Sequence, residues 1–236
     1  MSRPFDPAKT SLRRAPFLKT IHVSRTRRAV YVNNPKVACS TIKLALQRSE
    51  LDDPAYQPAI SVHDHETSPL LTWPELTPGA LSARLAESFV FSFVRNPYRR
   101  LQSAYVNKIV EPQKSGRPRQ HAGFAADELP SFDAFIRSIA ARDPTRHNPH
   151  WRPQWINLSI DAIPYDFIGR LEAFRADWAT VADRLRLDPE PERAGKTTRP
   201  VQAAYTAQNA ALVARAYARD FEAFGYDPDV IPGLDA

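Results

Sequence analysis

Glycine, cysteine and long apolar runs are scarce in this chain of 236 residues, and each scarcity excludes a class of protein. The seven glycines form no Gly-x-x-x-x-Gly-Lys-Ser/Thr segment, which excludes the ordinary phosphate loop of ATPases. The single cysteine, Cys39, excludes an intrachain disulfide and a cysteine-based metal cluster. No apolar run reaches the roughly 18 residues of a membrane span. We therefore expect a cytoplasmic protein with no integral membrane segment, and we leave peripheral association open.

The overall composition is that of a globular protein, with 43% hydrophobic and 25% charged residues. Lys and Arg exceed Asp and Glu, 32 to 26, and the net charge of +6 suits a polyanionic or phosphorylated ligand. The length favours one sizeable core. We expect residues 1–27 to form a basic, partly flexible arm and residues 28–236 to form one domain, while the Ala, Arg and Pro content resembles a bacterial coding bias.

Two strand-turn-helix units in series set the expected fold. The first has a buried strand over residues 29–32 and a helix from Ser40. The second has an apolar strand over residues 89–94, after which Asn96 and Pro97 begin a helix. Consecutive units of this kind predict a right-handed crossover and a P-loop-like three-layer α/β/α fold, with a central parallel sheet and surrounding helices.

The rest of the chain reads as helices separated by loops. Polar and flexible residues from Glu111 to Leu129 predict a long excursion, and Ser131 is suited to capping the helix that follows. Apolar spacing predicts another helix from Leu171 to Leu185. The prolines of residues 188–200 indicate a loop, and a last helix over residues 206–224 should end at Gly225.

The turn after the first strand has the features of an anion site. Backbone N–H groups at a helix N-terminus converge on one point, and Lys36 adds a full positive charge there. An ordinary crossover, with Lys36 and Lys43 in solvent, explains the same residues. The candidate ligands of the turn are Lys36, Val37, Ala38, Cys39, Ser40 and Thr41.

The second unit offers a second anion site. Arg95 leaves the end of its strand with a guanidinium that can grip a phosphate through two hydrogen bonds, and Ser103 adds a hydroxyl from the helix. Ligands of open α/β folds bind at the carboxyl ends of parallel strands, where both turns are expected. Two anion sites one nucleoside apart become a reasonable prediction.

The two turns resemble the cofactor motifs of the carbohydrate sulfotransferases, in particular the chondroitin and dermatan 4-O branch. The matching segments are Pro-Lys-Val-Ala-Cys-Ser-Thr at 35–41 and Phe-Val-Arg-Asn-Pro-Tyr-Arg-Arg-Leu-Gln-Ser-Ala-Tyr-Val-Asn-Lys at 93–108. The resemblance implies 3'-phosphoadenosine 5'-phosphosulfate (PAPS) as co-substrate, with no metal. It assigns Lys36 to the 5'-phosphosulfate and Arg95 and Ser103 to the 3'-phosphate.

The likeness continues through three later blocks, at residues 150–154, 165–172 and 217–226. Two departures stand out. Asn96 replaces an acidic residue that usually follows the arginine of the second motif, and the cysteines that follow the Trp-x-Pro block in Golgi relatives are missing. The second departure fits a reducing compartment.

Transfer of a sulfonyl group to a hydroxyl calls for a base, and histidine is the natural candidate. His63 and His65 lie between the two motifs, in a His-x-His pair that resembles the heparan 2-O branch, whose second histidine is the base. We therefore prefer His65 and rank His150 behind both. Asp64 or Glu66 could orient the ring. A metal site at this pair and plain surface histidines are the alternatives.

The sequence says little about which acceptor the protein uses or which residues bind it. Lys196 and Arg199 are further candidates for the nucleotide, although a surface turn explains them equally well. We expect a carbohydrate acceptor and no nucleic acid, and the oligomeric state is open. The rival functions are a kinase on a similar fold, a basic nucleic-acid-binding module and a non-catalytic nucleotide- or glycan-binding relative. Basic residues suited to an acidic saccharide, or to a solvated face, are Lys108, Lys114, Arg117, Arg119, Arg146 and Arg152.

Overall fold

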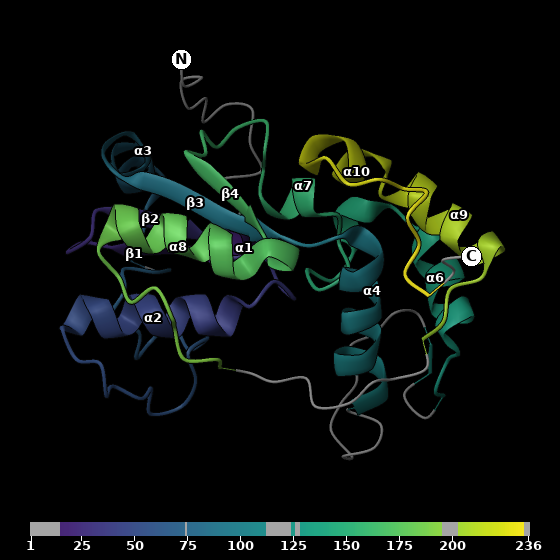
Figure 1. The fold of residues 1–236 in the computed structure, drawn as a ribbon, viewed down its shortest axis with the longest axis horizontal. Coiled ribbons are helices and arrows are strands. Elements are labelled where there is room, and N and C mark those ends of the chain that lie inside the picture. The colour runs from purple at the N-terminus through teal and green to yellow at the C-terminus, as the bar shows by residue number, and fades with distance from the viewer. Residues whose placement is uncertain (1–14, 74, 112–123, 126–127, 195–202, 234–236) are drawn as a thin grey trace. The chain divides into compact units, whose positions relative to one another are not determined.

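The computed structural model describes residues 15–73, 75–111, 124–125, 128–194 and 203–233 (Figure 1). The chain forms two compact units. Unit 1 comprises Met1–Val94 and Asn157–Lys196, and unit 2 comprises Arg95–Ile156 and Thr197–Ala236. The predicted boundary at residue 28 remains a prediction, and the span 28–236 is divided between these two units.

Unit 1 is built on a four-stranded sheet with the strand order β1-β2-β3-β4. The strands β2, β3 and β4 are parallel, with Tyr31 opposite Phe91 and Phe91 opposite Phe167, and β1 is antiparallel to β2 at the edge. The predicted α/β fold is therefore confirmed, and an antiparallel edge strand makes the sheet mixed. The strands are β1 (Ile21–Ser24), β2 (Ala29–Val32), β3 (Phe89–Val94) and β4 (Phe167–Arg170).

The edge strand β1 lies inside the segment that the sequence assigned to a flexible arm. All four of its residues are buried, and Val23 exchanges two backbone hydrogen bonds of 2.9 Å with Leu71. The sequence pattern missed β1 because it is only four residues long and includes the polar residues His22 and Ser24. Upstream of it the structure describes only a short helix, α1 (Ala15–Leu18), and residues 1–14 of the predicted arm lie outside the described residues.

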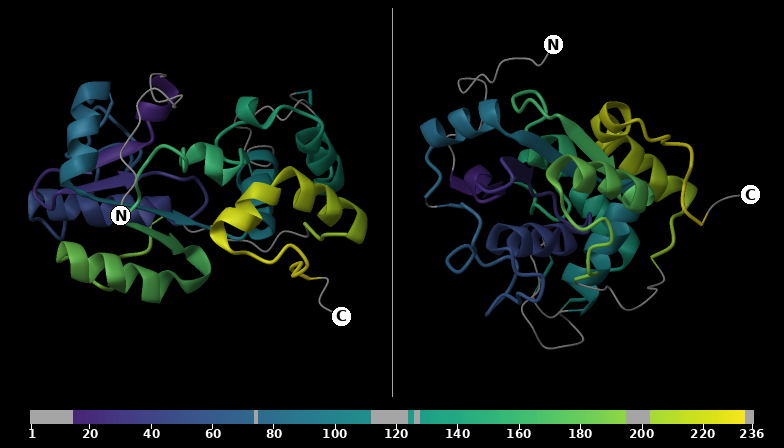
Figure 2. Two further views of the ribbon diagram at one scale, coloured as in Figure 1. Left: turned by 90° about the horizontal axis from the view of Figure 1, so that it is seen from above. Right: turned by 60° about the vertical axis from the view of Figure 1, so that its left-hand side comes forward.

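Helices cover both faces of the sheet. α2 (Cys39–Leu51) and α8 (Phe174–Leu185) share one core with the sheet, in which Ile42, Leu46 and Trp178 pack against Tyr31 and Phe91. α3 (Pro78–Glu87) lies on the opposite side of the sheet from α8 (Figure 2, left). A 3₁₀ turn, η5 (Leu171–Ala173), precedes α8, so the helix predicted from Leu171 begins in a tighter form.

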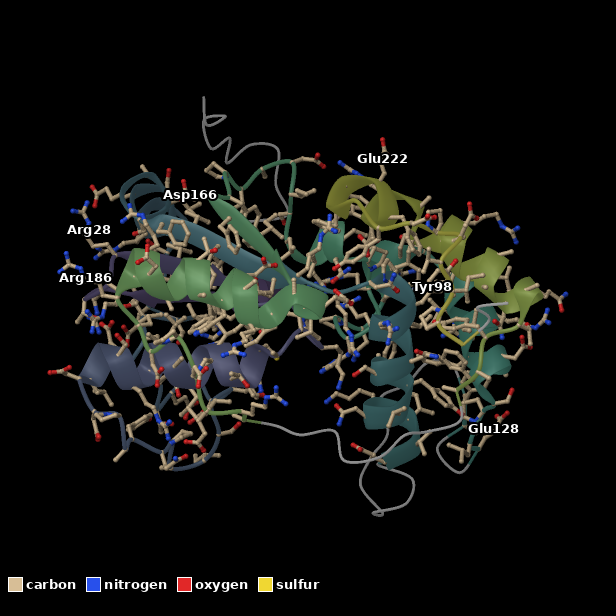
Figure 3. All side chains as sticks on the ribbon, viewed as in Figure 1. Arg28, Tyr98, Glu128, Asp166, Arg186 and Glu222 are labelled. Carbon is tan, nitrogen blue, oxygen red and sulfur yellow. The ribbon has the colours of Figure 1, made fainter. Side chains whose placement is uncertain are left out.

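Unit 2 is helical and has its own core. Tyr98, labelled in Figure 3, is buried there, packs edge-on against Tyr205 and donates a hydrogen bond of 2.7 Å to the Pro228 carbonyl. The cap predicted at Ser131 and the helix start predicted at Asn96 are confirmed, and each side chain accepts a backbone N–H of the first turn of its helix. The short helix α7 (Gln154–Asn157) begins in unit 2, and its last residue belongs to unit 1. The other helices of unit 2 in the described residues are α4 (Pro97–Tyr105), the π-helical η3 (Val106–Val110), α6 (Phe132–Ala140), the 3₁₀ helix η4 (Pro144–Arg146), α9 (Ala207–Ala216) and α10 (Ala218–Phe224).

The last predicted helix is in fact two helices. α9 starts with a capping box at Thr206, and the helical hydrogen bonding breaks at Tyr217, whose φ is −115°. The Tyr217 hydroxyl donates to the Trp151 carbonyl, which anchors the break in the core. Gly225 ends α10 with a φ of 63°, as predicted. None of the helices in the described residues is both long and apolar enough to cross a membrane.

A close approach inside unit 1 explains the glycine at position 169 in β4. A Cβ at Gly169 would lie 2.5 Å from the ring of Phe93, which is fully buried on the neighbouring strand β3. Gly169→Ala should therefore lower the free energy of unfolding by about 1–3 kcal/mol through overpacking. Urea denaturation of the purified protein measures this change.

The matched control is Gly79 in α3, where an added Cβ would meet nothing within 4 Å. Gly79→Ala should leave the free energy of unfolding unchanged or raise it by up to about 1 kcal/mol, because alanine is the better helix former. Equal destabilisation by both substitutions would contradict the overpacking argument.

Candidate functional site

Two turns leave the carboxyl ends of adjacent parallel strands. Residues 33–38 follow β2 and lead into α2, and Arg95 and Asn96 follow β3 and lead into α4. Because β2 and β3 are parallel neighbours, the two strand ends lie at the same edge of the sheet, as the sequence predicted. The turn after β2 belongs to unit 1, and Arg95 is the first residue of unit 2.

A buried side-chain amide fixes the turn after β2. Asn34 is fully buried, and its Nδ2 donates a hydrogen bond of 3.1 Å to the carbonyl of Phe93 in β3. Its Oδ1 accepts from Nδ2 of Asn157 at 3.2 Å. Ser92 adds a second tie, since its hydroxyl donates to the Val32 carbonyl at 2.7 Å. These bonds hold the start of the turn against the end of β3.

The turn itself has an unusual backbone. Lys36 has a φ of 74° and Ala38 a φ of 61°, a region that residues other than glycine seldom adopt. Ala38 is the N-cap of α2 and provides no side-chain hydrogen bond to the first turn of the helix. Backbone in which the sign of φ alternates forms concave sets of N–H groups that bind anions. The positive end of the helix dipole increases the positive potential there. Backbone strain at such a turn is typical of a functional site.

The Thr41 hydroxyl, which the sequence analysis had proposed as an anion ligand, binds to the backbone of Ala194. Its hydroxyl donates to the Ala194 carbonyl at 3.3 Å and accepts the Ala194 N–H at 3.1 Å. The single hydroxyl proton is therefore used within unit 1, and only the backbone N–H of Thr41 is left for an anion. Lys196 and Arg199, two further predicted ligands, lie outside the described residues.

His63 is bound to the first turns of α2. Its Nε2 lies 3.0 Å from Oγ of Ser40, and its Nδ1 lies 3.1 Å from Nζ of Lys43. A lysine ammonium only donates, so it fixes Nδ1 as the acceptor and Nε2–H as the donor to Ser40. The structure thus joins Ser40 and His63, which the sequence had nominated for different roles, and adds Lys43.

Lys43 is a buried amine in α2, the helix that follows the turn after β2. Its side chain is 2% exposed, and burial lowers the pKa of its ammonium from 10.5 to about 8. From the sequence, Lys43 was considered only in the alternative of an ordinary crossover, in which it faces solvent. Its position near the start of α2, between the apolar residues Ile42 and Leu44, could have indicated its burial.

His65 packs against a second histidine. Its ring stacks on His22 of β1 with 5.4 Å between ring centroids, and its Nδ1 is buried without a hydrogen-bond partner among the described residues. Burial first, and the charge of Lys43 second, lower the pKa of His65. The pKa of buried His22 is lowered further by the same two causes. Both rings are therefore neutral at pH 7.

The carboxylates near this pair do not orient the ring as the sequence suggested. Asp64 accepts the hydroxyl proton of Thr67 and the backbone N–H groups of Glu66 and Thr67, so its carboxylate closes its own turn. The Thr67 hydroxyl is the main reason why the pKa of Asp64 is lowered. Among the described residues, no three His, Cys, Asp or Glu side chains are grouped so as to hold a metal ion.

In unit 2, the backbone of Arg95 is clamped by a buried glutamine. Gln154 accepts the Arg95 N–H at 3.0 Å through Oε1 and donates to the Arg95 carbonyl at 2.8 Å through Nε2. Gln154 is itself held, because its backbone N–H and that of Trp155 donate to the carboxylate of Asp220 at 2.8 and 2.9 Å. The clamp positions the backbone from which the Arg95 side chain extends.

The neighbours of Arg95 support the same turn. Asn96, which departs from the acidic residue of the family pattern, accepts the Arg99 N–H at 3.3 Å and caps α4. Ser103 is half-buried two turns further along this helix. Buried Arg100 donates to the carbonyls of Arg152 and Pro149, both at 2.9 Å, and burial lowers its pKa to about 10. Arg100 thus has a structural role.

The third candidate base, His150, lies in unit 2 and is bound locally. Its Nδ1 is 2.7 Å from Oδ1 of Asn148, which also accepts the His150 backbone N–H at 3.0 Å. The next residue, Trp151, is buried and packs edge-on against Phe135. This block is a packed part of the unit 2 core.

Comparison with known proteins gives one consistent result. The family model described as "Sulfotransferase family" matches residues 19–227. Carbohydrate sulfotransferase 14 of Danio rerio is 34% identical over 186 residues, covering 74% of this chain and 50% of the relative. The Homo sapiens protein of the same name is 35% identical over 189 residues, covering 75% and 49%.

More distant relatives agree. Carbohydrate sulfotransferase 12 of Xenopus laevis is 29% identical over 198 residues, covering 67% of this chain and 46% of the relative. The chain spans about half the length of these curated relatives. They are animal proteins, so the expectation of a bacterial member gains no support from them. No solved structure matches the chain significantly.

Burial of Lys43 predicts a specific pH dependence of stability. The folded pKa of about 8 lies below the ordinary value of 10.5, so the folded state disfavours the charged amine. The resulting cost is complete below pH 8 and disappears as the pH rises to 10.5. Between pH 7 and pH 10, the stability of the wild type should rise by about 2–3 kcal/mol relative to Lys43→Met, measured by urea denaturation.

The control for this prediction is Lys19→Met, which removes an exposed lysine near β1. Its stability difference from the wild type should stay constant between the two pH values. A constant difference for Lys43→Met as well would show that Lys43 is solvated, against the burial described above.

Proposed function

The chain belongs to the sulfotransferase family, and we propose that it transfers the sulfonyl group of PAPS to a hydroxyl of a carbohydrate. The strained turn after β2 carries this proposal, because it combines an uncapped helix N-terminus, two residues of positive φ and the charge of Lys36. Arg95, which follows the adjacent parallel strand, supports it. The names of the relatives supply the carbohydrate part of the proposal.

We assign the co-substrate's groups to individual residues. The 5'-phosphosulfate goes to Lys36 and to the backbone N–H groups from Val37 to Thr41, with Ser40 adding its hydroxyl. The 3'-phosphate goes to Arg95 and Ser103, because a guanidinium binds a phosphate through two parallel hydrogen bonds. Lys196 and Arg199 remain further candidates, supported by the anchoring of Ala194 to Thr41 at the start of α2.

The co-substrate supplies the sulfonyl group, and the protein residues supply charge and a base. The acceptor oxygen forms a bond to sulfur, the bond from sulfur to the phosphate oxygen breaks, and 3'-phosphoadenosine 5'-phosphate leaves. Lys36 stabilises the negative charge that develops on the leaving phosphate. The acceptor's proton passes to a histidine. The resemblance of the two motifs to the family implies that no step requires a metal.

His65 fits the role of base better than His63. Both ring nitrogens of His63 lie within hydrogen-bonding distance of Ser40 or Lys43, and the bond to Lys43 occupies its lone pair. His65 is neutral at pH 7 because burial and Lys43 lower its pKa, and a neutral ring is the form that accepts a proton. His63 is then a positioning residue that holds Ser40 at the helix N-terminus.

We also propose a reducing, cytoplasmic compartment, as the single cysteine suggests. Cys39 begins α2 within the proposed nucleotide site, and its partial exposure leaves it open to oxidation outside such a compartment. Fractionation of the native host cell, followed by detection of the protein, tests the location.

Binding of the product nucleotide tests the site. At about 100 times its dissociation constant, 3'-phosphoadenosine 5'-phosphate should raise the melting temperature by about 5–10 °C. Arg95→Ala removes charged hydrogen bonds worth about 3 kcal/mol and should abolish most of this rise. Lys36→Ala should act in the same direction, and differential scanning fluorimetry measures both.

The matched control is Arg99→Ala, which removes an exposed arginine from the same helix, α4. The variant should keep the full nucleotide-induced rise. If Arg95→Ala keeps it as well, or if the wild type shows none, the assignment of the 3'-phosphate fails.

Transfer of labelled sulfate to a panel of polysaccharides tests the base. His65→Ala should keep the nucleotide-induced rise in melting temperature and lose about 10²- to 10⁴-fold in kcat/KM, because proton transfer contributes that much. His63→Ala should lose less, since its role is to position Ser40. Normal turnover by His65→Ala would assign the base elsewhere, and His150→Ala is the comparison for that case.

A further inference from the structure

Unit 2 contains a cavity that no residue of the proposed nucleotide site lines. Its volume is about 240 Å³, and it is bounded by the end of α6, by η4 and by the turn that follows. Pockets for drug-sized ligands begin at about 300 Å³, so this cavity has room for one sugar-sized group. The lining residues are Ile139, Arg142, Asp143, Arg146, His147, Asn148 and Trp151.

Hydrogen bonds from buried side chains hold the backbone that forms the wall of the cavity. Arg100 donates to the carbonyls of Pro149 and Arg152, and Tyr217 donates to the carbonyl of Trp151. The Asn148 carbonyl accepts the backbone N–H groups of Trp151 and Arg152 at 3.0 and 2.9 Å. A site with a fixed wall loses little conformational entropy when a ligand binds.

His147 presents unused hydrogen-bonding capacity at this wall. Both ring nitrogens are buried and lack a hydrogen-bond partner among the described residues, although the carbonyls of Ile139 and Arg142 lie near the ring. A neutral imidazole offers one donor and one acceptor. A buried polar group without a partner costs free energy, and a ligand hydroxyl that bonds to it removes this cost.

The charge of the cavity is positive. The side chains of Arg142 and Arg146 are exposed, and neither forms an ion pair or a hydrogen bond with another side chain in the described part of the chain. Asp143 is the one lining carboxylate, and it accepts the backbone N–H and the hydroxyl of Thr145 at 2.9 and 2.8 Å. Two guanidinium groups against one engaged carboxylate favour an anionic ligand.

We propose that this cavity binds one acidic sugar residue of the acceptor. Its carboxylate or sulfate binds to Arg142 and Arg146, and one of its hydroxyls bonds to His147. The inference rests on the proposed carbohydrate acceptor and adds to it the charge of the sugar and the residues that select it.

The test uses NMR of the intact protein with small glycosides as probes and the ring signals of His147 as readout. Methyl glucuronide and methyl galactoside 6-sulfate carry the carboxylate and the sulfate separately, and methyl glucoside is the neutral comparison. We expect at least one charged glycoside to shift the His147 signals, with a dissociation constant at least about tenfold below that of methyl glucoside, since a charged hydrogen bond contributes that factor or more.

Variants assign the binding to the cavity. Arg142→Gln and Arg146→Gln should each raise the dissociation constant of the charged glycoside about tenfold or more, because each removes a charged hydrogen bond. The matched control is Arg215→Gln, an exposed arginine on α9 that does not line the cavity, and it should bind as the wild type does.

Three results would overturn the inference: no charged glycoside shifts His147, methyl glucoside binds equally well, or the Arg142 and Arg146 variants bind like the wild type. Equal binding of inorganic sulfate alone would reduce the cavity to an anion site and would also overturn it. The nucleotide-induced rise in melting temperature is measured on the same samples. Its absence in the wild type would refute the proposed function, whereas its presence with unchanged glycoside binding in the variants would refute this inference alone.

Discussion

The buried amide of Asn34 is the constraint on which the proposed 5'-phosphosulfate site depends. Asn34 is the second residue after β2, and its side chain joins the turn to the Phe93 carbonyl in β3 and to Asn157. A buried amide that lost either partner would leave an unsatisfied polar group, at a cost of about 1–3 kcal/mol. The turn therefore cannot shift without breaking these bonds, and Lys36, two residues later, extends from a fixed backbone.

The arginine of the second motif follows the same design in unit 2. Gln154 binds both backbone groups of Arg95, and Asp220 binds the backbone at Gln154 and Trp155. Burial raises the pKa of Asp220, but the hydrogen bonds that it accepts and the nearby charge of Arg100 favour its ionised form. In both motifs, buried polar groups position the backbone from which the charged side chain extends. Gln154 and Asp220 lie in the blocks at residues 150–154 and 217–226, which the sequence analysis had singled out.

The sequence predicted the elements that carry strong local signals. The apolar runs of β2 and β3, the helix start at Asn96, the cap at Ser131 and the helix end at Gly225 all follow from local chemistry. The parallel pairing of β2 with β3 followed from their crossover. Short strands whose stability comes from partners elsewhere were missed, namely β1 and β4. The contacts of His63 with Lys43, of His65 with His22 and of Thr41 with Ala194 join residues 20 or more positions apart, and no local pattern encodes them.

The absence of the Walker glycines becomes understandable from the packing of the turn. Positive φ at Lys36 and Ala38 costs about 1–2 kcal/mol per residue, a cost that glycine would avoid. Val37, between them, is fully buried in the core formed by the sheet, α2 and α8, and burial of a valine side chain contributes about 1.5–3 kcal/mol. That burial offsets much of the strain and fixes the conformation of the turn. A turn stabilised in this way has its shape without a ligand, so the proposed nucleotide would spend little of its binding free energy on ordering it.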